Sequence, residues 1–222
     1  MNTVYKFITG NAQGSFNDLY KKKESLGRGA FGLVYKVTHK SSKEIWAVKE
    51  ILTGGMKPHQ KHLVDTEIDI MKDCVHENIV RFKEHFFENE TVYIIMELCT
   101  EGDLRAAMDA QKQSGEPFSR DQLFKWIIGL FKAVVYLHRK NIIHRDIKPD
   151  NILLSVAKDV KITDFNISRI LGTLQLNEKS KFFYLPGRPS AVILSLTCSP
   201  YFHQICPQNA TENRNTFFVK NI

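Results

Sequence analysis

Three glycines and a valine near the N-terminus have the spacing of a phosphate-binding site. They occur as Gly27-x-Gly29-x-x-Gly32-x-Val34. Glycine lets the backbone approach phosphate oxygens closely, because no Cβ intervenes and unusual φ angles cost little. A dinucleotide-binding turn has the same pattern, but that turn must open a helix. Here the residues after Gly32 continue as a strand, so we expect the glycines to bend a hairpin, and a nicotinamide-dependent enzyme is disfavoured.

A lysine and a glutamate follow at a spacing that suits an ion pair. Ala47 and Lys49 alternate along the next predicted strand, so their side chains lie on the same face. The small side chain of Ala47 leaves room for an adenine ring to pack against it, while the Lys49 ammonium reaches phosphate oxygens. A lone strand lysine is usually solvated, but Glu67 follows on a predicted helix. A Lys49–Glu67 pair would hold the ammonium in place for a nucleotide.

The elements that must position these residues divide the chain into two parts. Hydrophobic periodicity predicts strands within 20–52 and at 80–87 and 91–98, and helices at 61–74, 104–113 and 119–139. Ser119 is the predicted N-cap of the long helix, and short strands and loops follow at 141–163. An order of mostly strands and then mostly helices predicts an α+β fold of two lobes joined near residues 97–102.

A third group of polar residues brings a family resemblance. The stretch His144-Arg145-Asp146-Ile147-Lys148-Pro149-Asp150-Asn151 resembles the eukaryotic protein kinases, and so do the glycine hairpin, Ala47-Val48-Lys49 and Asp164-Phe165-Asn166. The four motifs occur in order and at compatible spacings. The resemblance implies a protein-kinase-like two-lobe fold. Its N-lobe, residues 20–98, would hold a five-stranded antiparallel sheet plus one helix, and residues 99–171 would begin a truncated, mostly helical C-lobe.

The resemblance also implies a reaction and its residues. The expected activity is transfer of the γ-phosphoryl group of ATP, with Mg²⁺, to a protein serine or threonine hydroxyl. Asp146 would accept or orient the hydroxyl proton, and Lys148, typical of the serine/threonine branch, would neutralise the transferring group; Lys49 and Glu67 complete the catalytic set. Asn151 and Asp164 would hold Mg²⁺ through oxygen ligands.

The resemblance further assigns residues to nucleotide binding. They are Leu26, Gly27, Gly29, Gly32, Val34, Ala47, Lys49, Met96, Glu97, Cys99 and Leu153. For the apolar members, ordinary core packing predicts the same burial. The Glu101-Gly-Asp-Leu stretch and the polar helix after it look most similar to the NIMA-related group of kinases.

The chain departs from the family pattern at both ends. Residues 1–19 are expected to be a loosely held lead-in, and residues 172–222 a divergent, poorly ordered tail, because the pattern stops after Ile170. Apolar residues of the 119–139 helix would then lack their usual cover, unless the tail or a regulatory partner supplies it. The alternative hypothesis is a catalytically inactive kinase fragment that binds nucleotide or another protein.

Composition limits the remaining classes of function. The 31 Lys and Arg against 24 Asp and Glu give a net charge of +7, but the charges are scattered, and Lys21-Lys22-Lys23 reads as a solvated strand edge. Nucleic acid is not an expected partner. Four cysteines without framework spacing predict reduced thiols and a cytoplasmic or nuclear protein. No apolar run is long enough to span a bilayer, so no membrane partner is expected.

Overall fold

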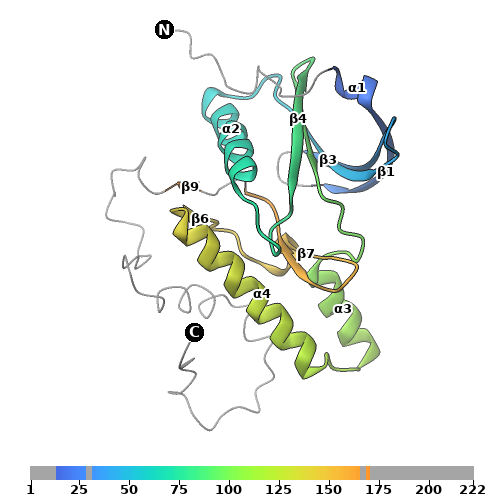
Figure 1. Cartoon of the computed structure of the whole chain (residues 1–222), viewed down its shortest axis with the longest axis vertical. Coiled ribbons are helices and arrows are strands. Elements are labelled where there is room, and N and C mark those ends of the chain that lie inside the picture. Colours follow the sequence, from blue (N-terminus) through green and yellow to red (C-terminus); the bar gives the residue numbers. More distant parts are fainter. Residues whose placement is uncertain (1–13, 29–31, 166–168, 171–222) are drawn as a thin grey trace. The chain divides into compact units, whose positions relative to one another are not determined.

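The computed structural model of the chain describes residues 14–28, 32–165 and 169–170 (Figure 1). The chain divides into two units, Met1–Asn177 and Glu178–Ile222, and every described residue belongs to the first. The predictions that lie outside the described residues concern residues 1–13 of the lead-in, Gly29, Asn166 and the tail 172–222.

Five antiparallel strands form the sheet that the sequence predicts. Along the chain they are β1 (Tyr20–Arg28), β2 (Leu33–His39), β3 (Ile45–Leu52), β4 (Phe82–Glu88) and β5 (Thr91–Met96). Their order in space is β1-β2-β3-β5-β4, so β3 is central and β1 is an edge. Because β2 follows Gly32 directly, the glycine segment joins two strands and does not open a helix. Lys21, Lys22 and Lys23 are exposed on β1, which confirms the solvated edge.

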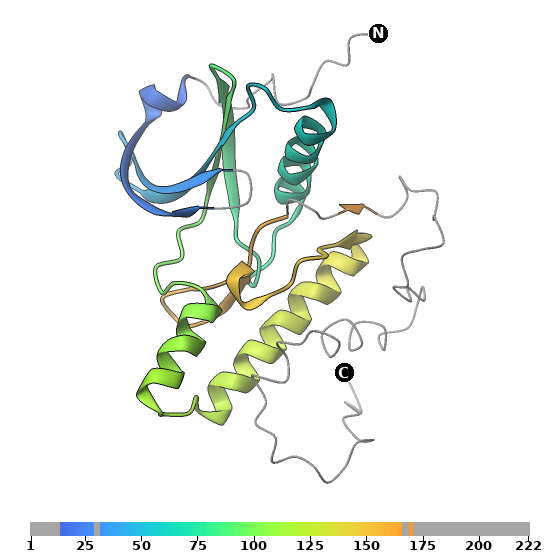
Figure 2. The same cartoon turned by 180° about the vertical axis from the view of Figure 1, so that it is seen from behind.

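Helix α2 (Pro58–Asp73) connects β3 to β4 and packs against β4, as both views show (Figures 1 and 2). It begins three residues before the predicted start at residue 61. Pro58 suits the first turn, where its missing N–H loses no helical hydrogen bond. The side chain of Gln60 adds a cap, because its Oε1 accepts the N–H of Lys57 at 2.9 Å. Polar residues before the apolar face therefore lengthen the helix.

Strand β4 begins two residues later than predicted, because the preceding residues bond to the second half of the fold. The N–H of Val80 donates to the carbonyl of Ile162 at 2.9 Å, and the N–H of Ile162 donates to the carbonyl of Asn78 at 2.9 Å. Apolar residues at 79 and 80 gave a strand signal, but their partner is a distant strand outside the five-stranded sheet.

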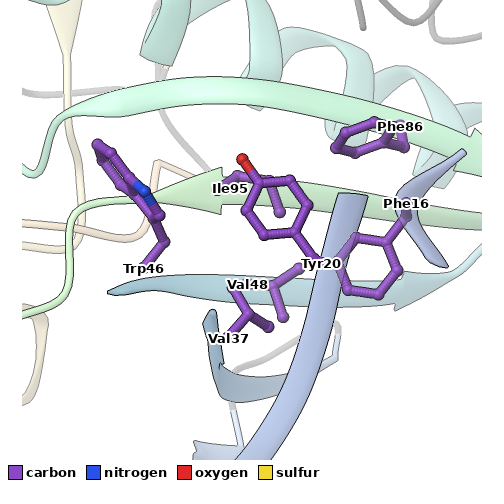
Figure 3. Close-up of a cluster of buried hydrophobic side chains, with 7 residues drawn as sticks. All are labelled: Phe16, Tyr20, Val37, Trp46, Val48, Phe86 and Ile95. Carbon is purple, nitrogen blue, oxygen red and sulfur yellow. The ribbon is translucent and has the colours of Figure 1, made fainter. Parts of the chain in front are cut away.

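Residues before β1 pack on the face of the sheet that carries Val48 and Ile95. Ser15 caps helix α1 (Phe16–Leu19), and the ring of Phe16 stacks on Tyr93 with centroids 4.2 Å apart. Figure 3 shows the cluster that results, whose members are Phe16, Tyr20, Val37, Trp46, Val48, Phe86 and Ile95. We expected a loosely held lead-in over residues 1–19. Residues 15–19 differ, because the sheet offers an aromatic site in which Phe16 is only 1% exposed.

The second half of the described chain begins with two helices. Helix α3 (Leu104–Ser114) is capped by Asp103, and α4 (Arg120–Arg139) by Ser119. The hydroxyl of Ser119 accepts the N–H of Gln122 at 3.1 Å, which confirms the predicted cap. The short elements that follow are β6 (Ile142–Ile143), η2 (Pro149–Asn151), β7 (Ile152–Leu154), β8 (Val160–Ile162) and β9 (Arg169–Ile170). Antiparallel pairing joins β7 to β8 and β6 to β9.

Helix α4 is buried on one side and exposed on another. Trp126 and Leu137 lie in the core, and the indole N–H of Trp126 donates to the carbonyl of Lys158 at 2.8 Å. Phe124 is 57% exposed and Ile128 is 52% exposed. Large apolar side chains of this helix are therefore exposed. None of the described helices combines the length and the apolar character needed to cross a bilayer.

Candidate functional site

Lys49 lies at the centre of the site, between two carboxylates from distant parts of the chain. Its Nζ is 2.7 Å from Oε1 of Glu67 on α2 and 3.0 Å from Oδ1 of Asp164, which follows β8. Lys49 is 5% exposed and Glu67 is 1% exposed. The predicted Lys49–Glu67 pair is thus present, and Asp164 joins it. Strand alternation explains the arrangement, because Val48 faces the outer cluster and its neighbour Lys49 faces α2.

The two carboxylates decide the charge of this lysine. Burial alone would lower the pKa of the Lys49 ammonium, but Glu67 and Asp164 outweigh burial and raise it. Burial raises the pKa of the Glu67 carboxyl, and Lys49 opposes that rise. A buried charge is retained only when it is paired and hydrogen-bonded. The site therefore holds a fixed positive charge whose position is set by its two partners.

Asp164 reaches this position through its neighbours. The N–H of Thr163 donates to the carbonyl of Asn151 at 3.1 Å. The segment after β8, which carries Asp164, is therefore bonded to the end of η2, which carries Asn151. Asp164 itself has φ +68°, a left-handed conformation that aspartate tolerates better than most residues. Phe165 follows and is fully buried against the ring of His144, with centroids 4.9 Å apart.

In the segment before β7, two polar side chains contact the carboxylate of Asp146. Nζ of Lys148 is 2.8 Å from Oδ2 of Asp146. The side-chain amide of Asn151 donates to the same Oδ2 at 2.8 Å and to the backbone carbonyl of Asp146 at 2.9 Å. The hydrogen bond that Lys148 donates to Asp146 raises the pKa of the Lys148 ammonium. The side chains of Asp146 and Lys148 are about one-third exposed, so a second molecule can reach them.

His144 is a supporting residue to which our sequence analysis gave no role. Its Nε2 lies 3.0 Å from the carbonyl of Thr163, and its Nδ1 accepts the N–H of Asp146 at 3.3 Å. Burial lowers the pKa of His144, which suits a neutral ring with its proton on Nε2. A histidine two residues before a reactive carboxylate was the available signal. Its ring links Asp146 to the segment that carries Asp164.

The glycine hairpin lies across from the lysine. Gly27 pairs with Val34, and Val34 in turn pairs with Lys49 in the sheet. A Cβ on Gly32 would come within 1.9 Å of the carbonyl oxygen of Glu50, so no side chain fits there. Leu26, just before the glycines, is 46% exposed, and its assignment to nucleotide binding stays a prediction. The described part of the hairpin is thus placed beside the ammonium.

The residues assigned to the purine are brought together in part. Ala47 and Met96 are register partners on β3 and β5, and both are buried. The N–H of Glu97 donates to the carbonyl of Arg81 at 2.8 Å, so this N–H is bonded within the chain. Leu153 bridges to Asp103 rather than to either of these strands. The assignment of Val34, Ala47 and Leu153 to nucleotide binding stays a prediction.

Cys99 is half-buried in the segment between the two halves. Burial raises the pKa of its thiol to about 11, so the sulfur is protonated at neutral pH and is a poor nucleophile. The assignment of Cys99 to nucleotide binding stays a prediction. Within the part of the chain that the structure describes, no group of three or more His, Cys, Asp or Glu side chains is arranged to hold a metal ion.

The donor set fits a hard cation better than a soft one. The amide nitrogen of Asn151 is used by Asp146, so its oxygen is left as a possible ligand. Asp164 supplies a carboxylate from the adjoining segment. Amide and carboxylate oxygens suit Mg²⁺. A polyphosphate placed here would meet the Lys49 ammonium, a cation held by Asn151 and Asp164, and the accessible carboxylate of Asp146.

A comparison with known families agrees with this geometry. The family described as "Protein kinase domain" matches residues 20–184, which is most of the chain. The match extends past residue 171, where we expected the resemblance to end. Within the described residues it covers the sheet, α2 to α4 and the site.

Individual relatives share the same stretch. A probable serine/threonine-protein kinase nek1 of Dictyostelium discoideum is 35% identical over 72% of this chain and 36% of its own length. The serine/threonine-protein kinase Nek11 of Mus musculus is 37% identical over 68% of this chain and 24% of its own length. Myosin light chain kinase A of Dictyostelium discoideum is 40% identical over 69% of this chain and 52% of its own length. The chain thus spans from about a quarter to about half of the length of these relatives.

Proposed function

Because this chain belongs to the protein kinase family, we propose that it transfers the γ-phosphoryl group of ATP, with Mg²⁺, to a serine or threonine hydroxyl of a protein. The observation that carries the proposal is the double contact of Lys49 with Glu67 and Asp164. Three elements far apart in sequence converge there on one ammonium. Phosphoryl transfer needs mainly such positioning and charge stabilisation, and little covalent chemistry from the protein.

Each residue of the site has a role in the proposed reaction. Lys49 binds phosphate oxygens, and Glu67 fixes the direction of its ammonium. Asp146 orients the acceptor hydroxyl and takes its proton, while Lys148 balances charge on the transferred group. Both tasks suit their partial exposure, because the acceptor belongs to another protein.

Asn151 and Asp164 are the residues that would hold Mg²⁺. When bound, the cation neutralises charge on the phosphate oxygens. Two hydrogen bonds to backbone carbonyls connect the segments that carry Asn151 and Asp164. Thr163 bonds to the carbonyl of Asn151, and His144 bonds to the carbonyl of Thr163. These contacts keep the two candidate ligands in adjoining segments.

Three finer assignments accompany the proposal. The relatives named nek1 and Nek11 support placement in the NIMA-related group, although a myosin light chain kinase is similarly close. The free thiols of Cys74 and Cys99 support a cytoplasmic or nuclear location. Exposed Phe124 and Ile128 on α4 support a regulatory partner that covers this helix.

A phosphotransfer assay tests the proposed activity. The chain is incubated with Mg²⁺, γ-labelled ATP and a generic basic protein, and phosphorylated residues are identified by mass spectrometry. We expect phosphoserine and phosphothreonine, and a loss of about 10²–10⁴-fold in turnover on Asp146→Asn. Asp159→Asn, which alters an exposed pair with Lys125, is the control and should keep its activity. If the wild-type chain binds ATP without turnover, the inactive nucleotide-binding fragment replaces this proposal.

A further inference from the structure

Strand β8 is held on two sides just before it delivers Asp164. It pairs with β7 on one side. On the other side, Ile162 exchanges backbone hydrogen bonds with Asn78 and Val80, each 2.9 Å long. Asn78 adds a third contact, because its side-chain amide donates to the carbonyl of Val160 at 2.9 Å. The strand is therefore fixed to the loop that follows α2, the helix of Glu67.

A lysine on this strand reaches the segment that joins the two halves. Nζ of Lys161 is 2.8 Å from Oε1 and 2.9 Å from Oε2 of Glu97. The side chains are 14% and 26% exposed. Glu97 directly follows β5, and its Oε2 also accepts the N–H of Arg81 at 3.2 Å. The carboxylate thus ties three segments together in a setting where solvent screens the charges only in part.

A second ion pair ties the far end of the same segment. Lys158, in the β7–β8 turn, pairs with Glu101, and these side chains are 53% and 31% exposed. The N–H of Leu154 also donates to the carbonyl of Gly102 at 2.9 Å. Exposed pairs contribute little. The less exposed Lys161–Glu97 pair is therefore the stronger side-chain link of the two.

We propose that Lys161 is a positioning residue for phosphoryl transfer, which acts by holding the joining segment at Glu97 against the strand that carries Asp164. The inference rests on the proposed function, because a nucleotide would contact both sides of this link. Its purine would lie along residues 97–99, and its phosphates would lie beside Lys49 and Asp164. Without the link, binding would have to order two segments that are now ordered in advance.

The direction of the effect follows from the coexisting contacts. The Lys161–Glu97 pair is formed while Lys49 contacts both Glu67 and Asp164. It therefore favours the assembled site. Loss of the pair should weaken substrate and transition-state binding alike, which raises KM and leaves kcat nearly unchanged. The smallest typical coupling between two sites changes an affinity about fivefold. We expect a rise of this size in the KM for ATP.

Two readouts test the inference on the whole chain. The first is the KM for Mg·ATP and the kcat of wild type, Lys161→Gln, Glu97→Gln and the exchanged double variant Lys161→Glu with Glu97→Lys. The second is hydrogen exchange of the amides of residues 97–102 without nucleotide. Lys125→Gln is the control, since it removes a 2.8 Å ion pair that does not involve the joining segment.

We expect both single variants to raise the KM about fivefold and to speed exchange at 97–102. The exchanged double variant should recover part of each change, and Lys125→Gln should show neither. The inference is overturned if Lys161→Gln lowers the KM, leaves it unchanged, or leaves exchange at 97–102 unchanged. If the wild-type chain does not use Mg·ATP, the proposed function fails, while the exchange measurement still decides whether Lys161 holds the segment.

Discussion

The sheet half and the helical half of the described chain differ in how far their ion pairs are exposed to solvent. Lys49 and Glu67, in the sheet half, are 5% and 1% exposed, and α2 covers them. Asp146 and Lys148, in the helical half, form an equally short pair of 2.8 Å whose side chains are 34% and 39% exposed. A charge that must hold a phosphate benefits from a fixed direction. A carboxylate that must meet a hydroxyl of another protein has to remain accessible.

The apolar side chains show the same contrast. In the sheet half, α2 packs against β4, and the cluster around Phe16 buries aromatic and aliphatic side chains on one face of the sheet (Figure 3). Helix α4 leaves Phe124 and Ile128 more than half exposed. Rigidity is therefore built into the part that would hold the nucleotide. The part that would meet a protein is open.

The largest expected effect separates the two ion pairs. Lys49→Met leaves the buried Glu67 carboxylate without its partner and should lower the free energy of unfolding by about 3–5 kcal/mol. Lys148→Met removes an exposed pair and should change it by less than about 1 kcal/mol. Urea denaturation of both variants measures the difference. Equal losses would show that the two pairs do not differ in the way their exposures indicate.

The next test compares two phenylalanines. Phe16→Ala empties a site in the outer cluster and should destabilise the chain by about 3 kcal/mol. Phe124→Ala removes a ring that is 57% exposed and should change stability by about 0.5 kcal/mol or less. Thermal unfolding followed by circular dichroism gives both values. A large loss for Phe124→Ala would mean that the exposed face of α4 contributes to the core after all.

A smaller effect concerns one histidine of the sheet half. Burial, assisted by Lys72, lowers the pKa of His85 from 6.5 to about 4. The unfolded chain therefore binds a proton near pH 6.5 that the folded chain binds only near pH 4, so stability falls as the pH drops through this interval. Between pH 7 and pH 5 the wild type should lose about 2 kcal/mol more than His85→Phe. Parallel urea series at both pH values test this, and equal losses would contradict it.

Local patterns predicted much of the fold because they depend on near neighbours. Ser119 before an apolar periodicity marked the start of α4, and it is the observed cap. Strand alternation placed Lys49 opposite the face of Val48, and the helical position of Glu67 supplied its partner. Asp146, Lys148 and Asn151 lie close together in sequence, so their loop brings them into contact with little help from the rest of the chain.

Features that depend on distant partners were not predicted. Phe16 stands in a polar stretch, and its burial depends on an aromatic site formed by β4 and β5. Val80 was assigned to β4 by its apolar character, but its hydrogen bond goes to Ile162. Lys161 and Glu97 gave no signal as a pair, because an ion pair 64 residues apart in sequence has no local pattern.

The most direct test of the account is calorimetric titration of the chain with Mg·ATP and with adenosine. If the Lys49 ammonium and the candidate cation ligands bind a triphosphate, Mg·ATP should bind about tenfold tighter than adenosine or better, because charge-assisted hydrogen bonds add to the purine contacts. Asp164→Asn should remove most of that advantage and its dependence on Mg²⁺. Equal affinities for the two ligands, or an Mg·ATP affinity unchanged in Asp164→Asn, would contradict a phosphate site at Lys49.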